Sequence, residues 1–208
     1  MRQSAWSCMA GVVAVLTACT HAVEAPLYEP NTDPRHRYLV TVELNDSPGR
    51  FDEVVAAVRY RVGPDRGCLP DAEAVSGSFP TPEQAYRYPP LVRMSATRYA
   101  AQVDLDGMAA KDYFGKGVCS WVFEGVSFAF KATAAAQDTR FVASLGPRDF
   151  VERQPVRLWF KRKTYPRHVV DGVAEHGTPD LDRIPGFAAS DLFSATLSAK
   201  ELNDGHPQ

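Results

Sequence analysis

The chain has 208 residues, a formal net charge of −2 and 45% hydrophobic side chains. Its 23 Lys and Arg nearly balance its 25 Asp and Glu, which argues against a non-specific nucleic-acid binder, because such proteins carry a basic excess. The length allows one large β domain or two small ones, with enough apolar side chains for a sizeable core.

Residues 1–18 have the pattern of a signal peptide. Arg2 is their only charged side chain, and the apolar run over residues 9–18 is too short to span a bilayer stably. The run leads into Leu16-Thr17-Ala18-Cys19, which resembles the lipobox of bacterial lipoproteins. The resemblance implies cleavage before Cys19 and acylation of Cys19, with palmitate among the chains, and several acyl chains anchor a protein stably. The alternative is an ordinary secretory signal with a chance cysteine.

The segment after the lipobox predicts a membrane-tethered domain. Thr20 rather than Asp follows Cys19, and by analogy with enteric sorting this favours the outer membrane, with the domain facing the periplasm. Residues 19–36 contain Pro26, Pro30 and Pro34 and little apolar periodicity, so we expect an extended tether.

Short alternating segments separated by Pro and Gly turns follow the tether. Period-two alternation indicates half-buried strands. About eight such strands favour an all-β fold, an antiparallel β-sandwich of immunoglobulin-like or similar type, as a single domain over residues 37–200 with a polar tail over 201–208. The expected strands outside the central segment are residues 38–44, 54–62, 99–105, 141–145, 156–160 and 192–198.

The central segment, residues 112–133, predicts a β-hairpin. Alternation on both sides of Glu124-Gly125 places the turn at that pair. Cys119, Trp121 and Phe123 are spaced two apart and would share one face of the first strand. We expect Trp121 to lie in the core.

The cysteine count predicts one disulfide. Cys8 would leave with the signal peptide and Cys19 would carry lipid, which leaves Cys68 and Cys119. Two thiols in an oxidising compartment are most simply a disulfide, and a metal or redox pair would need more ligands or a closer spacing.

Residues 70–90 are repeatedly broken by proline and predict a long surface loop with at most a short helix over residues 82–86. Tyr86, Arg87 and Tyr88 near its end form an aromatic and basic cluster of the kind enriched at protein interfaces. The alternative is that the tyrosines fold back over a sheet edge.

Two other basic surfaces are candidates for binding an acidic partner. Arg59 and Arg61 share one face of a strand, for which a solvated face is the simpler interpretation. Trp159 lies among cations from Arg157 to Lys163 and could bind anionic lipid or an acidic protein, but charge also protects edge strands from aggregation. We favour the edge strand.

Metal-ligating and catalytic patterns are weak. The pair Asp104 and Asp106 lacks the spacing of a calcium loop and predicts a polar turn. In the late loop, residues 164–190, His168 and His176 lack the two-His spacing of a common metal site. No hydrolase, zinc-protease, phosphate-binding or dinucleotide motif occurs, although a two-carboxylate hydrolase needs no local motif. We expect no enzymatic activity, cofactor or metal.

The stretch Tyr113-Phe-Gly-Lys-Gly-Val-Cys-Ser-Trp-Val-Phe123, preceded by an early strand and a Cys, resembles a group of small proteobacterial lipoproteins. Some of these resemble immunity lipoproteins that protect a cell from its own secreted antibacterial effectors. The resemblance implies a protein-binding module that captures a toxin, with residues 70–90 and 164–190 as candidate loops. The alternatives are a structural or assembly lipoprotein of the envelope, and a hydrolase acting on envelope lipid or glycan.

Overall fold

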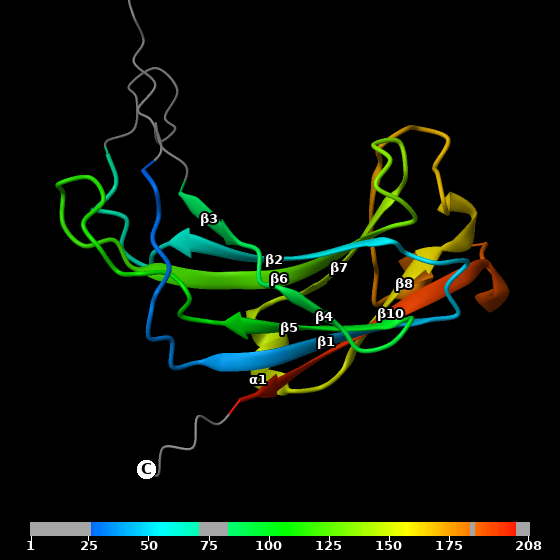
Figure 1. Ribbon diagram of the computed structural model, residues 1–208, viewed down its shortest axis with the longest axis horizontal. Coiled ribbons are helices and arrows are strands. Elements are labelled where there is room, and N and C mark those ends of the chain that lie inside the picture. The colour runs from blue at the N-terminus through cyan, green and yellow to red at the C-terminus, as the bar shows by residue number, and fades with distance from the viewer. Residues whose placement is uncertain (1–25, 71–82, 184–185, 203–208) are drawn as a thin grey trace, which may run out of the picture.

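The structure is a computed structural model that describes residues 26–70, 83–183 and 186–202. Two five-stranded sheets pack face to face, which confirms the predicted β-sandwich (Figure 1). Every ladder is antiparallel except the one between β7 and β9. The predicted signal peptide, Cys19, residues 71–82 of the long loop and residues 203–208 of the predicted polar tail lie outside the described residues.

The first sheet has the strand order β4-β5-β1-β10-β8. Its central strands carry the alternation that the sequence shows, because each turns every second side chain toward the second sheet. The bounds are β1 Arg37–Asn45, β4 Leu91–Arg93, β5 Arg98–Asp104, β8 Val156–Lys161 and β10 Leu192–Glu201.

The second sheet has the order β3-β2-β6-β7-β9. Its bounds are β2 Glu53–Val62, β3 Gln84–Arg87, β6 Trp121–Lys131, β7 Arg140–Leu145 and β9 Ala174–His176. Short helical turns complete the fold: α1 Pro147–Glu152, η1 Arg162–Thr164, η2 Leu181–Arg183 and η3 Ala189–Asp191. Among the described residues, no helix is long and apolar enough to cross a membrane.

Aromatic rings fill the core between the sheets. The ring of Phe141 packs edge-on against Phe51, Phe160 and Phe193, with ring centroids 5.2 to 5.8 Å apart. Full burial of one such side chain contributes about 2–3 kcal/mol, and edge-to-face pairing adds to it. The core therefore explains why the alternating segments fold as two facing layers.

The predicted hairpin turn at Glu124-Gly125 is wrong, because β6 runs unbroken through this pair. Its register with β2 shifts at this point, so that Glu124 and Gly125 together oppose Arg59. Phe123 and Val126, three residues apart, both point into the core. The break in alternation thus marks a β-bulge, which inserts one extra residue into a continuous strand.

The predicted disulfide between Cys68 and Cys119 is confirmed, with the two Cα atoms 5.3 Å apart. Both cysteines are buried in a small cluster with Val62 and Leu69. A cross-link over 51 residues contributes on the order of 4 kcal/mol in the chain-entropy model. Trp121 is only partly buried, contrary to expectation. It lies at the margin between the core and the disulfide cluster, where its indole N–H donates to the Ala109 carbonyl at 3.1 Å.

Residues 26–36, expected within the tether, pack onto the domain. The backbone of Asn31 donates to the Gly107 carbonyl at 3.0 Å, and Ala109 donates to the Glu29 carbonyl at 3.0 Å. The Asp106 carboxylate accepts the backbone N–H groups of Arg35 and His36, so this turn uses its acid to satisfy main-chain donors.

The long loops contain more structure than predicted. Residues 84–87 form strand β3 where a short helix was expected, because this segment finds a ladder partner in β2. The late loop contains β9, which pairs with β7. In Figure 1 the described ends of residues 70–90 lie toward one end of the sandwich and most of the late loop lies toward the other.

Candidate functional site

Strand β3 separates two hollows of the surface. In its antiparallel ladder with β2, Tyr86 lies opposite Arg59 and Arg87 lies opposite Val58. Successive side chains point to opposite faces of a sheet, so Tyr86 projects onto the outer face and Arg87 toward the gap between the sheets. The predicted cluster Tyr86, Arg87 and Tyr88 is therefore divided between two sites.

The first hollow lies on the outer face of the β3-β2-β6-β7-β9 sheet and has a volume of about 370 Å³. Small side chains form its floor, and Ser127 and Ser144 join their hydroxyls across it at 2.8 Å. Tyr86, Arg59 and His176 line it as larger groups. The remaining lining residues are Ala57, Glu124, Gly125, Val126, Leu145 and Gly146.

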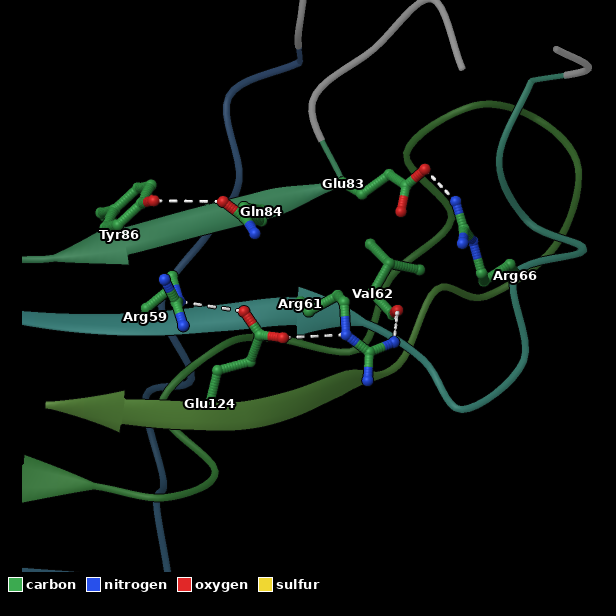
Figure 2. Close-up of polar contacts among 8 residues, drawn as sticks. All are labelled: Arg59, Arg61, Val62, Arg66, Glu83, Gln84, Tyr86 and Glu124. Carbon is green, nitrogen blue, oxygen red and sulfur yellow. Dashed lines mark hydrogen bonds and ion pairs between the residues drawn. The ribbon is translucent and has the colours of Figure 1, made fainter. Parts of the chain in front are cut away.

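Two guanidinium groups share one carboxylate beside this hollow. Glu124 lies between Arg59 and Arg61, with both nitrogen–oxygen distances 3.0 Å (Figure 2). The Glu124 side chain is 21% exposed, whereas the Arg59 and Arg61 side chains are 49% and 38% exposed. The accessible charge of this group is consequently positive, and the β-bulge puts Glu124 in place by adding an outward-facing residue to β6.

The second hollow is a cleft of about 320 Å³ at the open side of the sandwich. The chain crosses here from β3 in one sheet to β4 in the other through Tyr88, Pro89 and Pro90. Arg87 and Tyr88 line the cleft together with Asp104 of β5 and Asn31 of the N-terminal segment. The cleft therefore presents both charges and an aromatic ring.

Tyr60 forms the inner wall of the cleft. Its hydroxyl donates a 2.5 Å hydrogen bond to the Asp104 carbonyl. Burial raises the pKa of this phenol well above its ordinary value of 10.0, and the nearby Asp104 charge raises it further. The group thus stays neutral and acts as a structural donor. A Cβ at residue 107 would collide with this hydroxyl, which explains Gly107.

Tyr86 and Tyr88 do not fold back over the sheet. Their side chains are 49% and 68% exposed. Exposed tyrosine presents a large rigid surface with a polar end, which suits contact with a partner.

Trp159 lies apart from both hollows. It is partly buried on β8, at the edge of the other sheet, and its backbone pairs with Thr178 through two hydrogen bonds of 2.8 and 3.2 Å. The Arg157 guanidinium carbon lies 5.7 Å from its ring centroid. The expected edge position is thus observed, and Trp159 does not join the tyrosines.

The two late-loop histidines separate. His176 lines the outer hollow, whereas His168 Nδ1 accepts the Val170 backbone N–H at 3.0 Å. Within the described ranges, no three His, Cys, Asp or Glu side chains gather in a geometry that could hold a metal ion.

Sequence reasoning missed Glu124 and His176 as members of the outer hollow. The extra residue of the bulge interrupts the alternation at Glu124-Gly125, and this break was visible in the sequence. A turn and a bulge, however, produce the same local pattern. No sequence pattern placed His176 near this hollow, because the parallel pairing of β9 with β7 brings it there.

Comparison of the chain with protein-family models, with curated proteins and with solved structures finds no match. The fold and the two hollows define the chain as a β-sandwich with an exposed aromatic and basic face.

Proposed function

We propose that this chain is a protein-binding module of the bacterial envelope, and that its partner contacts β3 and the two hollows beside it. The observation that carries the proposal is the exposed grouping of Tyr86 and Arg59 around a hollow with a floor of small side chains. Tyr and Arg are the side chains enriched where protein interfaces concentrate their binding energy. A small-residue floor leaves room for an inserted side chain of the partner.

The proposed setting is an outer-membrane lipoprotein facing the periplasm, anchored through Cys19. The lipobox supports this part of the proposal, together with the buried disulfide, which suits an oxidising compartment. Labelled palmitate should enter the protein and should be lost in Cys19→Ala. Unchanged labelling of that variant would contradict the anchor.

We further propose that the partner is an antibacterial effector that the module neutralises. Support comes from the resemblance of residues 113–123 to a group of small proteobacterial lipoproteins, some of which resemble immunity lipoproteins, and from the exposed face described above. Immunity requires tight one-to-one capture, which a hollow flanked by rigid aromatic and charged groups favours.

The test is capture from the source bacterium. The full chain, purified in detergent, is mixed with lysate and secreted fraction, and the retained proteins are identified by mass spectrometry. One stoichiometric partner with toxin-like enzymatic motifs is the expected result. Retention of envelope-machinery components instead would favour a structural or assembly role.

Matched variants then locate the surface on the captured partner. Tyr86→Ala should weaken binding by about 1–3 kcal/mol, because it removes an exposed aromatic anchor. Val169→Ser is the control, since Val169 is 95% exposed on the late loop. Binding lost in the Val169 variant and kept in the Tyr86 variant would refute the placement.

A further inference from the structure

The ladder register shows which main-chain groups of β3 are free. The Val62 N–H donates to the directly opposite Glu83 carbonyl at 2.8 Å. Directly opposite residues of an antiparallel pair alternate between hydrogen-bonded and non-hydrogen-bonded. Ala85 and Arg87 consequently bond to β2, and the N–H and C=O groups of Gln84 and Tyr86 point away from it.

Those outward groups face an open edge. In the part of the chain that the structure describes, no strand lies beyond β3 in its sheet. Proteins protect such edges with proline, inward charge or a covering segment. The edge strand of the other sheet, β4, follows directly on Pro89 and Pro90, whereas Gln84–Arg87 contains no proline. The charge that β3 carries, Arg87, disfavours basic or apolar strands but attracts an acidic one.

We propose that β3 accepts a sixth strand from an extended segment of the protein partner. The inference rests on the proposed protein-binding function and gives it a recognition mode, in which main-chain hydrogen bonds supply affinity and alternate side chains supply specificity. One face of the added strand continues the outer face beside Tyr86. Its other face covers the mouth of the cleft beside Arg87.

Charge defines the chemistry of the added segment. On the outer face the guanidinium groups of Arg59 and Arg61 already pair with the Glu124 carboxylate. On the cleft side Arg87 makes no ion pair with the described residues, and the Asp104 carboxylate across the cleft accepts from the Gln102 amide at 3.1 Å. The segment is therefore an extended strand whose acidic side chains lie on the cleft side, toward Arg87, and alternate with apolar side chains on the outer face beside Tyr86.

The test selects a random dodecapeptide library displayed on phage against the full chain in detergent. Selected peptides should combine acidic residues with alternating apolar ones. Gln84→Pro should lower their affinity by about tenfold or more, because proline removes the outward N–H, and Gln84→Ala should change it by less than about threefold. A library without binders, or equal affinity of the two variants, would overturn the proposal.

A second measurement does not depend on a variant. Bound peptide should slow amide hydrogen exchange at Gln84 and Tyr86 in the wild-type protein, and unchanged exchange there would also overturn strand addition. Partner capture that survives Gln84→Pro but is lost in Tyr86→Ala would leave the proposed function standing without strand addition. Partner capture that neither substitution weakens would refute the proposed binding surface itself.

Discussion

At the residue scale, Gly125 has a backbone requirement that its neighbours lack. Its φ is +147°, and a Cβ there would lie 2.6 Å from the Leu145 carbonyl oxygen. That oxygen belongs to the neighbouring strand β7 and cannot withdraw as a flexible side chain would. The glycine thereby permits the bulge that adds Glu124 to the outer face.

We predict that Gly125→Ala lowers the free energy of unfolding by about 2–3 kcal/mol, since it adds both strain and a backbone collision. Urea denaturation measures the loss. Gly146→Ala is the matched control, because Gly146 has a φ of −93° and its new Cβ would lie 3.8 Å from the Asp149 Oδ2 atom, an ordinary contact. Equal losses in the two variants would argue against strain at the bulge.

The Tyr60 phenol makes stability fall at alkaline pH. Its pKa is raised in the folded protein, mainly by burial, whereas in the unfolded chain it titrates near 10.0. Above that pH the unfolded state binds fewer protons than the folded state, so the free energy of unfolding decreases as pH rises. The stabilisation that the Tyr60 phenol provides is fully present below pH 10.

We predict that the free energy of unfolding of Tyr60→Phe falls less steeply with pH above pH 10 than that of the wild-type protein. The difference in slope for one group is at most about 1.4 kcal/mol per pH unit. At neutral pH the variant should also lose about 1 kcal/mol, because the Asp104 carbonyl loses its donor. Denaturation at pH 7 and above pH 10 tests both effects. An unchanged alkaline slope would show that Tyr60 ionises normally.

At the element scale, β3 shows why ladder partners matter more than local sequence. Its four residues follow a proline-rich segment and carry no long alternation, so a strand was not expected there from sequence. Pairing with β2 provides main-chain partners, and Ala85 buries its side chain in the core. Such non-local pairing overrides weak local preference.

The register predicts that proline destabilises the fold much more at residue 85 than at residue 84. Ala85→Pro removes an N–H that bonds to β2 and should cost about 3 kcal/mol, whereas Gln84→Pro removes an outward N–H and should cost less than about 1 kcal/mol. Chemical denaturation of both variants gives the comparison. A greater loss at Gln84 would mean that the register is shifted by one residue.

At the scale of the whole molecule, the β-sandwich was predictable because alternation in β1, β2, β5, β7, β8 and β10 is a local property of the sequence. The disulfide followed from the cysteine count. The bulge in β6, the strands β3 and β9, and the packing of residues 26–36 depend on partners distant in the chain, so local pattern could not show them.

The candidate site was predictable in part for the same reason. Tyr86, Arg87 and Tyr88 were named from composition, but their division between two hollows follows from the pairing of β3 with β2. Trp159 was named as a separate surface because of the cations around it, and the fold places it on the other sheet.

The most direct test of the account maps hydrogen exchange of the full chain with and without its captured partner. Binding at β3 predicts slowed exchange over residues 84–88 and over residues 57–61 of β2, with little change over residues 162–172. Protection confined to the late loop would contradict the central claim that the partner docks on β3 and its two hollows.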